Sequence, residues 1–272
     1  MSFGRLGAVG RGFGRMGAGG KSVLTGNSST VQQYLNRLPT RLSSSDEAIV
    51  AAYIDGLVSD GVWSRLDFLH LYVTADAANW PVNLISSSFT ASLASGVGNP
   101  PTWTSRAGIA GHFGASTYVD SNFNPSTAGG NYSQSDAMIC CWCSAPASAL
   151  AGDLFQQDTT VELFPRNSPD NKIYIQINDS TEGNVANGND GTGFWLLQRT
   201  TSNSRAVYRN DVQQLADSAA SVPLANANIV FLTNTFTGLM AAAGKSLNSS
   251  QRTAFYNRTL TAIQGLTLGV LP

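Results

Sequence analysis

Lys172-Ile173-Tyr174-Ile175-Gln176-Ile177-Asn178 alternates apolar and polar side chains with a period of two. Successive side chains of a β-strand point to opposite faces, so the three isoleucines share one face and the polar or amphipathic residues share the other. This is the pattern of a half-buried strand. Val161 and Leu163 repeat it over a shorter segment. The middle of the chain is therefore predicted to contain a β-sheet with one face in a core.

Other apolar runs in the same region are shorter and continuous, which is compatible with strands buried on both faces. These runs are Met138 to Cys143, Phe194 to Leu197 and Ile229 to Leu232. Arg205 to Arg209, followed by Asn210-Asp211, is typical of a strand that enters a tight turn. The segment from Asn178 to Gly193 is rich in Asn, Asp and Gly and is predicted to be a loop.

A helical pattern precedes the β region. Ser44 and Glu47 have the spacing of a capping box, and the apolar stripe that follows predicts a helix at about 45–59. A short helical turn bearing Trp63 and Leu66 is expected next. The β region is then expected to begin near residue 70.

A second helical pattern follows the β region, where Asn248 and Gln251 mark a start and predict a helix at about 249–264. Helices only at the flanks favour an antiparallel β-sandwich, because a parallel sheet needs a helix between successive strands. The predicted organisation is an extended arm at 1–42, a helical segment at 43–69, a sandwich at 70–245, and a C-terminal helix and tail at 246–272.

The N-terminal segment contains a tandem repeat with a spacing of ten, Phe3-Gly4-Arg5-Leu6 and then Phe13-Gly14-Arg15-Met16. Its many glycines give it too much backbone entropy and too little side-chain surface to fold alone. Yet large apolar side chains are unusual in a solvated linker. We expect an arm that becomes ordered in a groove of a partner protein. The candidate docking residues are Phe3, Arg5, Leu6, Arg11, Phe13, Arg15 and Met16.

The distribution of charge is uneven along the 272 residues. The first 45 residues contain six basic side chains and no acidic one, whereas the whole chain has a net charge of −1. The overall field therefore gives no reason to expect nucleic acid or a membrane as a partner. The arm could still contact phosphates, but its regular apolar spacing favours a protein groove. No apolar run has the length of a membrane span or a signal peptide.

Short motifs spread over most of the chain carry a resemblance to a known family. They are Gly61-Val62-Trp63-Ser64-Arg65-Leu66-Asp67, Ala78-Asn79-Trp80, Gly108-Ile109-Ala110-Gly111, Thr117-Tyr118-Val119-Asp120, Ser121-Asn122-Phe123-Asn124-Pro125, Tyr208-Arg209-Asn210-Asp211, and Leu247-Asn248-Ser249-Ser250-Gln251 running to Gly265. From Ile49 to Gly265 the chain resembles phage and prophage proteins with a lectin-like jelly-roll domain of the concanavalin A or laminin G type.

The resemblance implies a structural, non-enzymatic virion protein such as a head spike, fibre base, decoration or tail-associated protein. It further implies other virion proteins as partners, a homo-oligomer, and a location in the virion after assembly in the host cytoplasm. The alternative is a carbohydrate-binding module that recognises a host surface glycan. Trp103, beside Pro100-Pro101, is the candidate glycan contact, whereas Trp142 and Trp195 lie in apolar strands and are expected to be buried.

A glycan hydrolase would need paired carboxylates. The chain has three glutamates, Glu47, Glu162 and Glu182. Glu47 is expected to serve a helix cap, and Glu162 has no acidic residue two or three positions away, so a pair could form only by convergence of distant segments. No enzymatic activity is expected.

A metal site is the alternative interpretation of Cys140, Cys141 and Cys143, with His70 and His112 as further ligands. Strand alternation sends Cys140 away from the other two cysteines, which leaves too few convergent ligands. We therefore expect reduced cysteines in a core. The two Gly-Lys-Ser segments lack the glycine that a phosphate-binding loop has five residues earlier. No metal or cofactor is expected.

Overall fold

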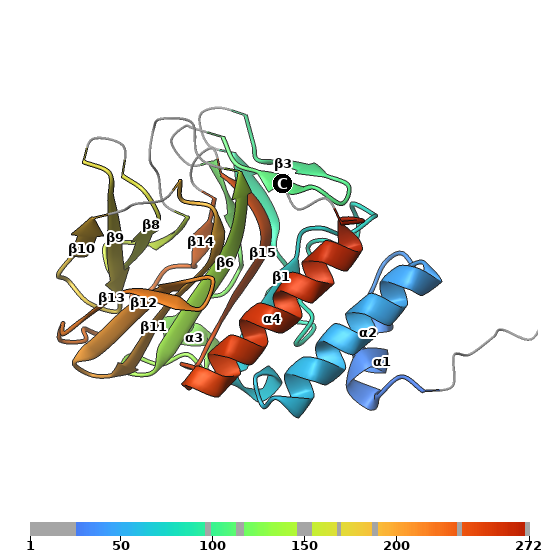
Figure 1. Ribbon diagram of the computed structural model, residues 1–272, viewed down its shortest axis with the longest axis horizontal. Helices are drawn as coiled ribbons and strands as arrows, with labels where there is room; N and C mark the ends of the chain where they lie inside the picture. The colour runs from blue at the N-terminus through green and yellow to red at the C-terminus, as the bar shows by residue number, and fades with distance from the viewer. Residues whose placement is uncertain are drawn as a thin grey trace, which may run out of the picture.

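A computed structural model of the chain describes residues 26–95, 99–112, 117–145, 154–167, 170–186, 190–232 and 236–269. Within these residues two β-sheets pack face to face, and every strand pairing is antiparallel. Helices cover the outer face of one sheet (Figure 1). The prediction of a lectin-like antiparallel β-sandwich with flanking helices is confirmed.

The first sheet is the one that the helices cover. Its strands are β1 (Leu66–Leu71), β3 (Thr102–Thr104), β4 (Gly108–Ala110), β6 (Ala137–Ala145), β11 (Gly193–Thr201), β12 (Ser204–Arg209), β13 (Val212–Asp217) and β15 (Thr237–Gly244). They lie in the order β13-β12-β11-β6-β15-β4-β3, and β1 also pairs with β15. Both residues of the predicted turn between β12 and β13, Asn210 and Asp211, have positive φ, as a tight hairpin turn requires.

The second sheet contains the stretch from which the fold was predicted. Its strands are β2 (Ser92–Ser95), β5 (Thr117–Asp120), β7 (Phe155–Gln157), β8 (Val161–Phe164), β9 (Lys172–Ile177), β10 (Gly183–Ala186) and β14 (Val230–Phe231). Their order is β10-β9-β8-β7-β14-β5-β2. In β9 the three isoleucines are buried and Tyr174 lies on the opposite face, half-buried, which confirms the predicted alternation.

One part of the predicted loop from Asn178 to Gly193 is a strand instead. Gly183–Ala186 forms β10 and pairs with β9 in the register Gly183 to Ile175 and Val185 to Ile173. Glycine and asparagine have low strand propensity, so the pairing depends on the neighbouring strand. A glycine is also needed at position 183, because a Cβ atom there would lie 2.6 Å from the Arg205 guanidinium.

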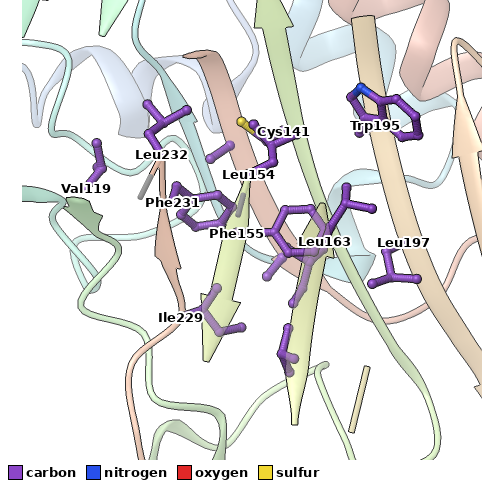
Figure 2. Packing of buried hydrophobic residues seen from close by; sticks show 14 of the residues in the cluster. Val119, Cys141, Leu154, Phe155, Leu163, Trp195, Leu197, Ile229, Phe231 and Leu232 are labelled. Atoms are coloured by element: carbon purple, nitrogen blue, oxygen red, sulfur yellow. The ribbon is translucent and has the colours of Figure 1, made fainter. Parts of the chain in front are cut away.

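The main core fills the space between the two sheets. Figure 2 shows Phe155, Leu163 and Phe231 of the second sheet facing Cys141, Trp195 and Leu197 of the first. Trp195 is completely buried, and its indole Nε1 donates a hydrogen bond to a backbone carbonyl at 2.8 Å. The predicted burial of Trp195 is confirmed, as is that of Trp142.

A second core lies between the first sheet and the helices. The helical elements on this side are α1 (Ser29–Leu35), α2 (Ser44–Ser59), the 3₁₀ turn η1 (Trp63–Arg65) and α4 (Ser249–Leu266), whereas α3 (Pro125–Ala128) packs against the main core. Helices α2 and α4 lie side by side (Figure 1), and the Tyr53 hydroxyl is 2.8 Å from the Thr259 hydroxyl across their contact. Cys140 belongs to this second core, whereas Cys141 and Cys143 lie between the sheets. All three are buried thiols, as predicted.

The start of α4 is as predicted, but the start of α2 is not. Asn248 and Gln251 form a reciprocal capping box at α4. At α2 the N-cap is Ser43, one residue before the expected Ser44. Ser43 has the extended backbone of a cap, and its hydroxyl accepts a hydrogen bond from the Asp46 backbone N–H. Glu47 is not part of a cap; its carboxylate accepts from Asn27 Nδ2 at 3.0 Å.

The boundaries at the N-terminal side also differ from the expected ones. Within the segment 1–42 that was expected to be extended, α1 is a helix whose Val31 and Tyr34 are buried in the second core. This i, i+3 apolar pair gives the short helix one face to bury against α2. Strand β1 begins at Leu66 rather than near 70. The tandem repeat itself lies outside the described residues.

Candidate functional site

A pocket of about 300 Å³ lies on the outer face of the second sheet, at β8, β9 and the two connections that follow them. Two carboxylates, one amide and two aromatic rings line it. These side chains are Glu162, Phe164, Asn167, Tyr174 and Glu182. Polar acceptors and apolar rings at one surface make this pocket the candidate site.

Strand alternation places three of these residues on the outer face. In β8, Val161 and Leu163 are buried in the core, so Glu162 and Phe164 point the other way. In β9 the isoleucines point inward and Tyr174 points outward. Phe164 pairs directly with Tyr174 in the β8–β9 register, which brings the two rings together.

The two aromatic rings form one wall. Their centroids are 6.4 Å apart with an interplanar angle of 78°, an edge-to-face arrangement. The Tyr174 hydroxyl donates a hydrogen bond to the Asp170 carboxylate, which fixes the direction of the ring. Tyr174 is half-buried, so part of the ring remains accessible to a ligand.

The two glutamates, Glu162 and Glu182, are the acidic groups of the pocket. Burial of the side chain and the negative charge of Glu182 raise the pKa of Glu162 to about 7 from its usual 4.5. Glu182 is twenty residues further along the chain, in the turn between β9 and β10. Spacing in the sequence alone therefore missed this pair, and only the strand order β10-β9-β8 brings it together.

A buried charge network holds the turn that carries Glu182. Asp179 accepts from Arg199 at 2.7 Å and from Arg205 at 2.6 Å, and all three side chains are at most 1% exposed. Arg205 also donates to the Thr181 carbonyl, one residue before Glu182, at 2.6 Å. Because Arg199 and Arg205 belong to the first sheet, the network fastens this turn of the second sheet to the other side of the sandwich.

The candidate glycan contact Trp103 lies elsewhere, in β3 of the first sheet. Its ring is half-buried against the main core, and its indole Nε1 donates to the Tyr72 carbonyl at 2.9 Å. The expected exposed tryptophan is thus partly committed to packing. The sequence had no signal for this contact, because Tyr72 is 31 residues away.

Among the described residues, the remaining candidates do not line this pocket. Phe3, Arg5, Leu6, Arg11, Phe13, Arg15 and Met16 lie outside the described residues. His70 is buried between Phe68 and Tyr72, and the His112 ring is near Thr102. In the described part of the chain, no three Cys, His, Asp or Glu side chains gather as a metal site. Within the same ranges, the helices include none that is long and apolar enough to cross a bilayer.

Neither a protein-family model nor a curated protein matches the chain. Among solved structures, it is similar to domain 4 of a GH43 extracellular arabinanase from Geobacillus stearothermophilus in complex with arabinotriose, with a TM-score of 0.50 and 13% identity. The match covers 70% of this chain and 98% of that domain. At this identity the likeness shows the fold alone, and it agrees with a lectin-like sandwich.

Two toxin domains are also similar. The binding domain of Paraclostridial Mosquitocidal Protein 1 has a TM-score of 0.47 and 12% identity over 72% of this chain. The botulinum neurotoxin serotype D ligand-binding domain, in complex with N-acetylneuraminic acid, has a TM-score of 0.49 and 10% identity over 74% of this chain. The matches span only 52% of each toxin domain.

Proposed function

We propose that the sandwich is a non-enzymatic carbohydrate-binding domain and that the pocket at Glu162 holds the sugar. The observation that carries this proposal is the convergence of two aromatic rings, two carboxylates and an amide on one outer sheet face. Sugars present both apolar C–H faces and vicinal hydroxyls, so they need this combination of groups. The arabinanase domain of similar fold, which was solved with arabinotriose, is consistent with it.

Each group has a defined part in this proposal. The accessible face of Tyr174 stacks on the C–H groups of a sugar ring, and Phe164 supports the tyrosine from its edge. Glu162, Glu182 and Asn167 exchange hydrogen bonds with the hydroxyls. The hydrogen bond from Tyr174 to Asp170 fixes the ring before binding, which lowers the entropy lost on association.

Replacing Tyr174 with alanine is expected to weaken glycan binding by about tenfold or more, which corresponds to about 1.4 kcal/mol, because the stacking face is lost. A glycan array on the full chain identifies the ligand, and titration calorimetry measures the change. Tyr118→Ala is the matched control, since Tyr118 is a half-buried tyrosine of the same sheet that does not line the pocket. Equal losses in both variants would contradict the proposed site.

Hydrolysis of the same glycan is the competing outcome, because a carboxyl with a pKa near 7 beside a second carboxylate has the composition of an acid–base pair. The array ligand should be incubated with the full chain and assayed for new reducing ends. We expect none. Release of reducing ends that disappears in both Glu162→Gln and Glu182→Gln would replace the binding module with a glycan hydrolase.

We propose in addition that the chain is a structural protein of a phage or phage-like particle, assembled as a homo-oligomer. Support comes from the family motifs between Ile49 and Gly265 and from the tandem repeat at residues 3–20. In this proposal the repeat docks on a neighbouring virion subunit. Phe3 and Phe13 would each contribute about 1.5 to 3 kcal/mol if fully buried there. The sandwich then displays its pocket toward a host surface glycan.

Deletion of residues 1–20 is expected to abolish incorporation into particles while the sandwich stays folded, because this glycine-rich repeat has little side-chain surface with which to stabilise a core. Incorporation is measured by immunoblot of purified particles, and folding by circular dichroism. Full-length Tyr174→Ala should be incorporated normally, since it changes only the pocket. Normal incorporation of the deletion variant would remove the basis for an anchoring arm.

A further inference from the structure

Helices α2 and α4 form a groove of about 400 Å³, mostly lined by apolar side chains. We call it the α2–α4 groove. Its lining residues are Ala48, Ile49, Ala52, Tyr53, Arg258, Thr261, Ala262 and Gly265, of which Arg258 is paired with Asp60. Small residues line it on both helices, and Ala48 and Ala52 are exposed. Its volume is in the range of sites that hold one or two large apolar groups.

The surroundings of this groove are acidic on the α2 side. Residues 44–60 contain four acidic side chains and no Lys or Arg. Asp46, Glu47 and Asp60 have arginine partners, which are Arg106, Arg41 and Arg258. Asp55 is exposed and has no ion pair among the described residues. Among these four carboxylates, Asp55 is therefore the one that favours a cationic occupant of the groove.

The described chain begins beside this same helix. Asn27 donates to Glu47 at 3.0 Å and Ser28 donates to Asp55 at 2.5 Å, so the segment before Gly26 leaves from the flank of α2. A helix is about 10 Å across with its side chains. The nine residues 17–25 can span up to about 30 Å when extended, so Met16 can reach the groove.

We propose that the α2–α4 groove binds the second repeat unit of the same chain, with Phe13 and Met16 as the apolar occupants. The neighbouring Arg11 and Arg15 then lie close to the uncompensated charge of Asp55, and the repeat's glycines allow its backbone to approach the exposed alanines. A short tether raises the local concentration of the repeat to about the millimolar range, so the chain's own repeat outcompetes a second copy at ordinary protein concentrations. The inference is independent of the carbohydrate pocket.

This arrangement removes two apolar surfaces from water in the free protein, the groove and the large side chains of the repeat. A virion subunit that docks the arm would then have to compete with the chain's own groove. The proposal thus assigns the repeat a resting site before assembly, whatever its final partner is.

Disulfide trapping in the full chain tests the proposal. Met16→Cys is combined with Ala52→Cys in the groove, and mild oxidation is followed by non-reducing electrophoresis; the three native cysteines are fully buried and do not compete. We expect a link within one chain, at least about tenfold faster than in the control Met16→Cys with Gln264→Cys. The tether is the same in both variants, so the difference would come from the groove, which holds position 16 beside position 52 and away from position 264. Gln264 is exposed on α4 but does not line the groove.

Each other outcome overturns the proposal. Links between chains, obtained also when the two single-cysteine variants are mixed, would mean that a second copy occupies the groove. Equal rates for Ala52→Cys and Gln264→Cys would mean that the repeat has no preference for it. Ala48→Cys, at a second exposed groove position, repeats the measurement if Ala52→Cys alters the fold.

Discussion

Replacing Asp179 with alanine is expected to lower the free energy of unfolding by about 3 to 5 kcal/mol. The carboxylate of Asp179 is the common acceptor of two buried guanidiniums, those of Arg199 and Arg205. Without it, Arg199 keeps only neutral carbonyl acceptors such as Ile177 O and Ala219 O. A buried charge without its counter-ion costs far more than an exposed one, because neither water nor another ion compensates it.

Urea denaturation of the wild type and the variant measures this loss. Asp190→Ala is the matched control: Asp190 pairs with Arg209 at 3.0 Å, but its side chain is 55% exposed, so its removal is expected to cost less than about 1 kcal/mol. Comparable losses for Asp179→Ala and Asp190→Ala would show that burial does not set the value of these ion pairs. The buried network would then contribute no more to stability than an exposed ion pair does.

The same network connects stability to the candidate site. Arg205 holds the Thr181 carbonyl, and Glu182 follows it in the turn toward β10. The turn is therefore fixed by charges that belong to the first sheet, although the pocket lies on the outer face of the second. Loss of Asp179 should loosen Glu182 as well as destabilise the sandwich.

The sandwich could be predicted because apolar and polar residues alternate within individual strands. In a sheet with a core on one side, alternation requires Ile173, Ile175 and Ile177 to point into that core. All three are buried in the structure. The helix at α4 was predictable for a similar reason, since Asn248 and Gln251 satisfy the helix start locally. The strand β10 was not, because its sequence gives no local preference and its formation depends on β9.

The candidate site was less predictable than the fold. Alternation alone places Tyr174 and Glu162 on an outer face, but the partner of Glu162 comes from a turn whose position depends on the order of three strands. Trp103 has the residue type of a glycan contact, but its indole N–H donates a hydrogen bond to the Tyr72 carbonyl, which lies in a distant segment of the chain. Side chains that converge through strand order leave no spacing signal in the sequence.

Acidification from pH 7.5 to pH 5 is expected to cost the protein about 2 kcal/mol of stability through His70 alone. His70 is completely buried in β1, and burial lowers its pKa to about 4 from 6.5, although the hydrogen bond to Phe89 opposes the shift. Nε2 lies 2.9 Å from the Phe89 carbonyl and must carry the proton in the neutral ring, while Nδ1 has no partner. A second proton would therefore enter a site with no acceptor for it.

The sign of the effect follows from the two states. Above pH 6.5 the imidazole is neutral in both the folded and the unfolded chain, so it adds no pH dependence. Between pH 6.5 and 4 only the unfolded chain takes up the proton, which favours unfolding, and the loss approaches about 3 kcal/mol near pH 4. Glu162 acts in the opposite direction over pH 4.5 to 7, because its pKa is raised in the folded state.

Comparison of variants separates His70 from the other titrating groups. His70→Gln keeps an N–H donor for the Phe89 carbonyl but cannot titrate, so its stability should fall by about 2 kcal/mol less than that of the wild type between pH 7.5 and 5. Parallel pH profiles for the wild type and His70→Gln would mean that the buried ring gains its proton without cost, which the missing acceptor at Nδ1 argues against.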